Sequence, residues 1–257
     1  MKKRIVRQSL EHILFVRHIP AAVYSWHIAG SFRVLREMEC IFGFVGDGFV
    51  ILGADTSVVQ SIVVQKTTED KILQLDSHKL MATSGEAGDR VIFSEYIQKN
   101  INLYNFRNGI PLSTAAAASF TRNELAVALR KNPYYVNLML GGFDKGKGPS
   151  LYFMDYIATL HQLEKGAVGY GSYFVLSVMD KYFRKGMSVE EGMALADKCI
   201  AEIRKRLIAS PHSFVLKIVD KDGARDLAWR SLEPAPSAGP PPVINPGEAS
   251  TSMQVQG

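Results

Sequence analysis

The stretch MECIFGFVGDGFVILGADTS, residues 38–57, decides the fold class. Two apolar runs, 39–45 and 49–54, flank the turn Gly46-Asp47-Gly48, a pattern typical of a β-hairpin. The second run leads directly into Asp55, a carboxylate at the end of a strand that we expect to be buried. Because a buried charge needs a partner, Asp55 raises the question of what it pairs with and whether it serves a nucleophile near the head of the first strand.

The chain beyond this hairpin alternates between strand and helix patterns. Short apolar runs bounded by turn residues predict strands, and apolar residues three and four apart predict helices. Further strands are predicted at 61–65, 71–74, 78–83, 134–141, 150–156, 158–163, 213–220 and 224–229. Helices are predicted after Gly85, Ser113, Gly171 and Ser188, the last beginning with a capping box of Ser188 and Glu191.

The order of these segments predicts an α+β fold. Strands joined by short turns form antiparallel sheets, and each pair of amphipathic helices must cover a sheet face. We therefore expect two sheets packed face to face, with helices outside. The first helix should bury Phe93, Tyr96, Ile97, Ile101 and Tyr104, and the third should bury Val175, Val178, Met179, Tyr182 and Phe183.

Charge and composition set the ends of the folded unit. The formal net charge of +5 comes entirely from residues 1–37, and the rest of the chain is formally neutral, which argues against nucleic acid as a partner. We interpret 1–37 as a dispensable basic extension, with organelle targeting as the less favoured alternative. Residues 232–257 hold six of the eleven prolines and predict a disordered tail. The folded domain should span 38–231.

Several motifs are interpreted as structural. The stretch GGFDKGKG (141–148) resembles a phosphate-binding loop but ends in Gly148 and is followed by a strand, so we interpret it as a hairpin loop. The stretches GYGS (169–172) and DKDG (220–223) are interpreted as turns. Cys40 and Cys199 are expected to be reduced, buried thiols of an intracellular protein, and no His spacing predicts a metal site. No apolar run is long enough to cross a membrane.

Asp55 and Lys71 form the most informative pair of charges. They lie on segments that could be near neighbours, and a desolvated lysine beside an aspartate can act in general-base catalysis. The same two residues can equally form a structural ion pair, which we favour unless a nucleophile lies beside them.

From Met38 to about Trp229 the chain resembles the beta subunits of the 20S proteasome core particle. The similarity is specific in SGEAGD (84–89), SEYIQKN (94–100), YYVNLMLGGFD (134–144), MDY (154–156) and GYGS (169–172). The resemblance implies a four-layer αββα sandwich of the N-terminal-nucleophile hydrolase type. It also implies assembly with other alpha and beta subunits into a 28-subunit particle without a cofactor, and a role in general and ubiquitin-dependent protein degradation in cytoplasm and nucleus.

The resemblance further implies that this member is non-catalytic. Catalytic relatives are cleaved after a glycine to expose a terminal threonine nucleophile, whereas here Met38 takes the threonine's place and follows Glu37. A thioether is no nucleophile for acyl transfer. The supporting residues are matched by Asp55, Lys71 and the oxyanion-binding Gly85. Tyr170, Ile208 and Pro211 stand where the family has a serine, an aspartate and a second serine.

Two alternatives remain at the level of sequence. An active N-terminal-nucleophile hydrolase could use Cys40, two residues out of register, or Ser31, seven residues upstream of Met38. A freestanding binding module would require a ligand motif, and none is evident. Some aromatic side chains are expected on the surface, because one core of this size cannot hold all of a set of six. The set is Tyr134, Tyr135, Tyr152, Tyr156, Tyr173 and Phe174.

Overall fold

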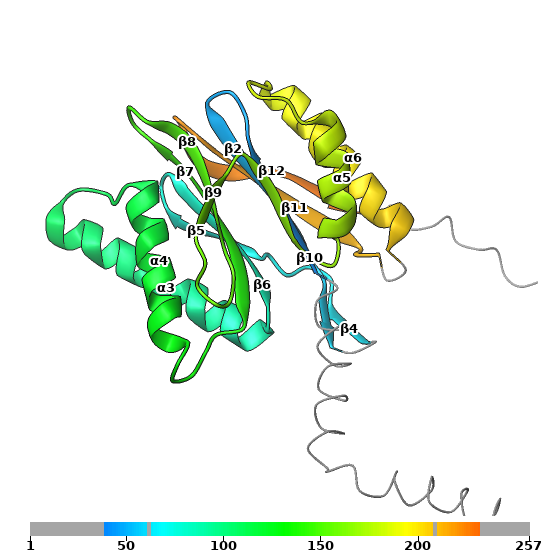
Figure 1. Cartoon of the computed structure of the whole chain (residues 1–257). Coiled ribbons are helices and arrows are strands. Elements are labelled where there is room, and N and C mark those ends of the chain that lie inside the picture. The colour runs from blue at the N-terminus through cyan, green and yellow to red at the C-terminus, as the bar shows by residue number, and fades with distance from the viewer. Residues whose placement is uncertain (1–38, 61–62, 208–209, 232–257) are drawn as a thin grey trace, which may run out of the picture.

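A computed structural model of the chain describes residues 39–60, 63–207 and 210–231 (Figure 1). The predicted basic extension and Pro-rich tail lie outside the described residues, as do Ser31, Met38 and Ile208. The described part contains two five-stranded antiparallel sheets and a short two-stranded hairpin.

The first sheet contains the hairpin that opens the described chain. Its strands, in spatial order, are β10 (Lys165–Gly169), β1 (Cys40–Val45), β2 (Phe49–Asp55), β11 (Ser213–Asp220) and β12 (Gly223–Ser231). The register places Ile41 opposite Ala54 and Phe214 opposite Asp55. The end of β2 therefore lies between strands from the two ends of the described chain.

The second sheet comes from the middle of the chain. Its spatial order is β5 (Ile72–Asp76), β6 (Lys79–Gly85), β7 (Val136–Asp144), β8 (Gly148–Met154) and β9 (His161–Leu163). The short hairpin is formed by β3 (Val58–Gln60) and β4 (Val63–Lys66). The β7–β8 connection is the predicted glycine-rich hairpin loop, and Gly148 pairs with Asp144 in the strand where a phosphate-binding loop would need a helix.

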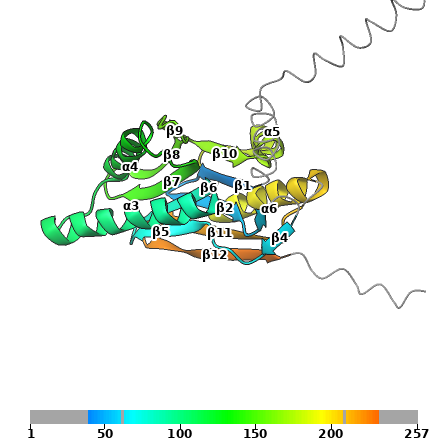
Figure 2. The ribbon, with the colours of Figure 1, turned by 90° about the horizontal axis from the view of Figure 1, so that it is seen from below.

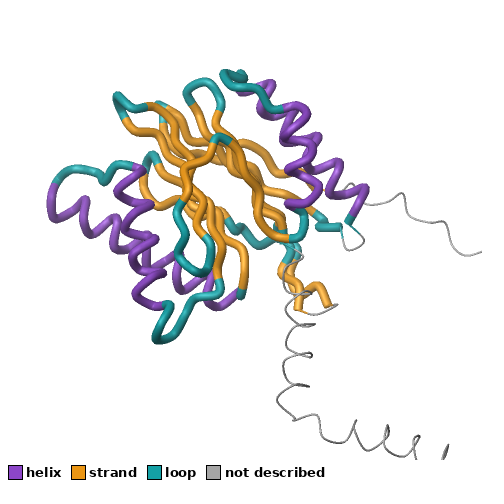
Figure 3. The backbone as a smooth tube through the Cα atoms, viewed as in Figure 1, coloured by secondary structure: helices purple, strands orange, loops and turns teal. Residues whose placement is uncertain are grey.

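The helices form two outer layers around the stacked sheets. Helices α3 (Ala87–Asn108) and α4 (Thr114–Ala128) cover the second sheet, and α5 (Ser172–Tyr182) and α6 (Val189–Arg206) cover the first. Figures 1 and 2 show the two helix pairs on opposite sides, and the tube in Figure 3 shows the strands between them. The predicted α+β sandwich with helices outside is confirmed. No helix among the described residues combines the length and apolar character needed to span a bilayer.

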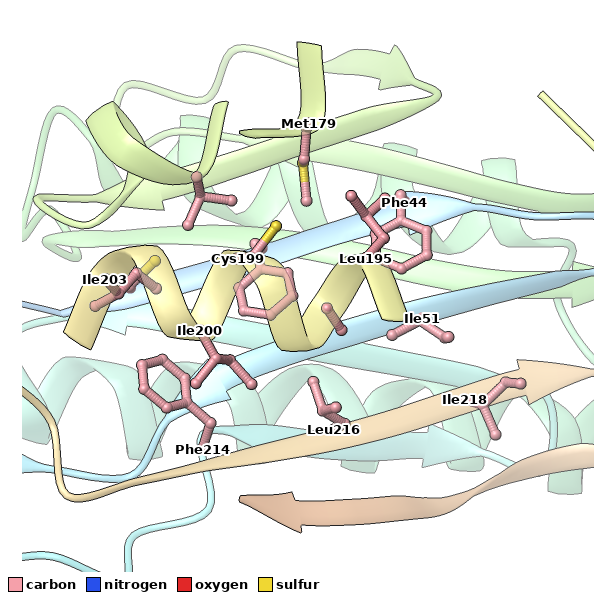
Figure 4. Packing of buried hydrophobic residues seen from close by; sticks show 14 of the residues in the cluster. Phe44, Ile51, Met179, Leu195, Cys199, Ile200, Ile203, Phe214, Leu216 and Ile218 are labelled. Carbon is pink, nitrogen blue, oxygen red and sulfur yellow. The ribbon is translucent and has the colours of Figure 1, made fainter. Parts of the chain in front are cut away.

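Each interface between layers has its own apolar cluster. Ile41, Leu52 and Met139 belong to the cluster between the two sheets. Phe93 and Ile97 of α3 pack on the second sheet. Leu195, Ile200 and other residues of α6 pack against Phe44 and Phe214 of the first, as Figure 4 shows. Three apolar interfaces are what a four-layer fold requires.

Some boundaries and burial assignments were wrong. The sequence predicted one strand over 158–163, whereas the structure has β9 and a separate β10 that pairs with β1 in the other sheet. Residues 158–160 are not in a strand. Tyr96, Tyr104 and Tyr182 were expected in the core but are exposed, because the helix face that contacts the sheet is narrower than the apolar pattern suggested.

The tyrosine-rich surface was partly anticipated. Tyr135, Tyr156 and Tyr173 are exposed, and the rings of Tyr135 and Tyr156 pair with centroids 6.2 Å apart. Tyr134 and Tyr152 pack against the cluster under α3 and α4, and Phe174 packs against the cluster under α5 and α6. Half of the set thus adds to the core and half to the surface.

Candidate functional site

Four residues from both sheets meet at one point of the fold. Glu39 immediately precedes β1 and Asp55 ends β2, both in the first sheet. Lys71 immediately precedes β5 and Gly85 ends β6, both in the second sheet. The predicted residues Asp55, Lys71 and Gly85 are therefore brought together by the stacking of the sheets, with Glu39 as an additional member.

Asp55 is held by hydrogen bonds to its own sheet and by an ion pair to the other. Its Oδ2 lies 2.9 Å from Lys71 Nζ and accepts a hydrogen bond from the Ser57 backbone N–H. Its Oδ1 accepts the Cys40 N–H at 2.8 Å. Both carboxylate oxygens are used, which is how a nearly fully buried charge is normally accommodated.

Glu39 occupies the space between Lys71 and Gly85. Its Oε1 lies 2.8 Å from Lys71 Nζ, and its Oε2 accepts the Gly85 N–H at 2.8 Å. The side chain is 14% exposed, so the contact is largely sheltered from water. Sequence reasoning missed Glu39 as a member of the site. No local pattern could have paired it with Gly85, 46 residues away.

Gly85 is glycine for a steric reason. Its φ of 126° is disfavoured for residues with a side chain, and an added Cβ would lie 2.2 Å from the Tyr135 carbonyl oxygen. The following Glu86 N–H is bonded to that same carbonyl, which fixes the turn into α3. The Gly85 N–H therefore points at the Glu39 carboxylate from a rigid backbone.

The electrostatics keep Lys71 protonated. Burial alone lowers the pKa of Lys71, but Asp55 and Glu39 raise it more, so the net pKa lies above its usual value. Burial raises the pKa of Glu39, while Lys71 opposes that effect. An ammonium stabilised by two carboxylates holds its proton at neutral pH. The arrangement is that of an ion-pair cluster, unlike the depressed lysine pKa that a general base requires.

Cys40 lies beside the cluster with its thiol turned into the core. Only its backbone N–H faces Asp55, and its side chain is fully buried in the apolar cluster under α5 and α6. A Cβ at Gly171 would lie 2.7 Å from Cys40 Sγ, so the thiol packs directly against this turn. Burial first, and then Asp55, raise the pKa of Cys40 well above its ordinary value. Both effects disfavour the nucleophilic thiolate.

Among the described residues, the other positions matched to the family's active site make no recorded contact with the ion-pair cluster around Lys71. Tyr170 is exposed and its ring packs edge-on against Tyr173. Pro211 is buried and has no group for acid–base chemistry. Among the residues that the structure describes, no three His, Cys, Asp or Glu side chains converge as metal ligands.

Comparison with known proteins identifies the family. Residues 38–219 match the family model described as "Proteasome subunit". The chain is 67% identical to proteasome subunit beta type-2-A of Arabidopsis thaliana over 193 residues, covering 75% of this chain and 95% of the relative. It is 46% identical to proteasome subunit beta type-2 of Dictyostelium discoideum over 197 residues, covering 76% of this chain and 99% of the relative.

A more distant relative carries a different subunit number. Proteasome subunit beta type-4 of Saccharomyces cerevisiae is 43% identical over 192 residues, covering 74% of this chain and 97% of the relative. The resemblance seen in the sequence motifs is thereby confirmed over the same region that forms the two-sheet sandwich. The chain belongs to the proteasome subunit family and is of its beta type.

Proposed function

We propose that this chain is a non-catalytic structural beta subunit of a 28-subunit proteasome core particle. One observation carries the proposal: the Lys71 ammonium is ion-paired with both Asp55 and Glu39. The sequence supports it, because Met38 takes the matched nucleophile position. The chain contributes to ring assembly, and through the particle to general and ubiquitin-dependent protein degradation. It does so without a cofactor, metal, nucleic acid or membrane, in the cytoplasm and nucleus.

The proposed domain division follows from the same assignment. Residues 38–231 form the beta-type domain, and the family match over 38–219 supports most of this range. Residues 1–37 are a dispensable basic extension and 232–257 a Pro-rich tail. No self-processing is expected, because Glu37 and Met38 replace the glycine–threonine junction. Terminal sequencing of the chain from purified particles tests this, and a Thr, Ser or Cys newly exposed within residues 25–45 would contradict it.

Native mass measurement of the purified particle tests incorporation and subunit number together. The expected particle contains this chain among 28 subunits. Peptide hydrolysis per particle should be unchanged when Met38 is replaced by alanine, since the thioether performs no step. Loss of one entire cleavage specificity in correctly assembled Met38→Ala particles would overturn the proposal. Localisation is tested separately by imaging a tagged chain, which should be found in both cytoplasm and nucleus.

The second candidate is an active hydrolase that uses Cys40 or Ser31. Ser31 lies outside the described residues, so the structure bears only on Cys40. Its buried thiol with a raised pKa predicts no reaction with iodoacetamide in native particles at about pH 8. Cys40 in particles unfolded with denaturant is the reactive control, because the same thiol is then exposed to the reagent. Rapid native labelling of Cys40 together with loss of a cleavage activity would favour the hydrolase.

A further inference from the structure

The contact between Glu39 and its two donors suggests a binding site that is already filled. Lys71 Nζ and the Gly85 N–H come from the second sheet, and each meets a different oxygen of one carboxylate from the first sheet. Two charge-compatible donors at 2.8 Å, one per oxygen, form the geometry that a carboxylate prefers.

Both donors are held in place by contacts other than Glu39. Lys71 is anchored by Asp55 at 2.9 Å. Gly85 is fixed by its backbone conformation and by the adjacent hydrogen bond from Glu86 to Tyr135. Removal of the Glu39 side chain should therefore leave a preformed pair of donors and not a collapsed strand end.

A second cation lies next to this position. Arg90, on the first turns of α3, is buried and its Nε has no hydrogen-bond partner in the described structure. The nearest carboxylate recorded for it, Glu69, is 3.8 Å away, and Arg90 also acts to lower the pKa of Glu39. Arg90 thus adds positive potential to the place where the Glu39 carboxylate sits.

We propose that Lys71 Nζ and the Gly85 N–H form a carboxylate-binding site that Glu39 fills from within the chain, which closes this centre and joins the two sheets. The site accepts a small carboxylate from solution only when the Glu39 side chain is absent. Asp55 and Glu69 already carry two negative charges nearby, so binding of an external carboxylate will be weak. This inference rests on the same Lys71–Glu39 contact as the proposed function, and the exchange measurement tests it separately from peptide hydrolysis.

The test measures hydrogen exchange at the Gly85 amide in assembled particles. Glu39→Ala should accelerate exchange at this amide by about tenfold or more, because the N–H loses its acceptor. Roughly 100 mM acetate, suited to millimolar affinity, should restore slow exchange, whereas chloride at equal ionic strength should not. Glu69→Ala is the matched control, since it removes a neighbouring carboxylate whose recorded side-chain partners are Lys66 and Arg90.

Each outcome decides the proposal. Unchanged exchange in Glu39→Ala overturns it, as does faster exchange that acetate slows no better than chloride. If Glu39→Ala particles do not assemble, Glu39→Asp withdraws the carboxylate by one methylene, and an unchanged Gly85 exchange rate in that variant also overturns it. Hydrolysis per particle, measured in parallel, reports on the proposed function alone.

Discussion

Lys71 is buried between two carboxylates, and loss of its ammonium leaves Asp55 and Glu39 facing each other without a cation. Removal of one partner from a buried ion pair costs roughly 3–5 kcal/mol. We therefore expect Lys71→Ala to reduce the thermal stability and yield of assembled particles, with peptide hydrolysis per remaining particle unchanged. Thermal unfolding and peptide hydrolysis of purified particles measure the two effects.

The partly exposed pair of Lys66 and Glu69 is the control for that experiment. The Lys66 side chain is half exposed, and an exposed pair contributes about 0–1 kcal/mol. Lys66→Ala should therefore leave particle stability almost unchanged. Normal stability of Lys71→Ala particles combined with loss of a cleavage specificity would identify Lys71 as catalytic.

The raised pKa of Lys71 also predicts an alkaline limit to stability. Burial lowers this pKa, but the two carboxylates raise it more, so the folded state holds the proton more tightly than the unfolded state. The stabilisation is complete below the unfolded value of about 10.4 and is lost as pH rises through the folded pKa. The difference in melting temperature between wild type and Lys71→Met should shrink above about pH 10.4. A difference that grows with alkaline pH would contradict this assignment.

The sequence predicted Asp55 and Lys71 as partners and favoured a structural ion pair over a catalytic role. Asp55 ends one predicted strand and Lys71 begins another, and the family resemblance matched both to the residues that support the nucleophile. Glu39 could not be found in this way. Its partners lie in the other sheet, and a contact between sheets depends on how they stack, which no local pattern records.

At the scale of single elements, the start of α6 offers a clean test of a local signal. The predicted capping box is present: Ser188 accepts the Glu191 N–H, and the Glu191 carboxylate accepts the Ser188 N–H. Ser188→Ala should destabilise the fold by about 1 kcal/mol. This loss corresponds to a lower melting temperature of the particle, or of any soluble form of the full chain.

Ser177→Ala is the matched control for the cap. Ser177 lies on the exposed side of α5, and its hydroxyl only bonds back to the Phe174 carbonyl. Alanine is the better helix former, so this change should be neutral or slightly stabilising. Equal destabilisation by both substitutions would show that the cap at Ser188 contributes nothing specific.

Elements with a strong local signal were predicted well, and weak ones were not. Helix α6 and the β1–β2 hairpin follow from a capping box and from turn residues between two apolar runs. The five-residue strand β10, KGAVG, contains two glycines and little apolar pattern. Its strand conformation comes from pairing with β1, a partner more than a hundred residues earlier, so tertiary contact and not propensity decides it.

At the scale of the whole molecule, the layers follow from the order of elements, but the outer surface needs partners. Large apolar side chains are exposed on both helix layers; Phe106 is 87%, Tyr173 75% and Ile92 60% exposed. Obligate interfaces bury about 2,000–5,000 Å² and are apolar, which fits a subunit that is never alone. The full chain expressed by itself should therefore self-associate, as sedimentation velocity would show, and co-expression with other beta subunits should suppress this.

The double variant Ile92→Ser with Phe106→Ser tests whether the α3 surface is responsible. Both side chains are exposed on α3, and their removal takes apolar area from the outer layer without touching the core. We expect less self-association of the isolated chain and, at the same time, weaker incorporation into particles. Lys99→Ser, an exposed polar position on the same helix, should change neither. If the double variant assembled as efficiently as wild type, the α3 surface would not be an obligate contact, because an interface that loses two large buried anchors loses several kcal/mol of association energy.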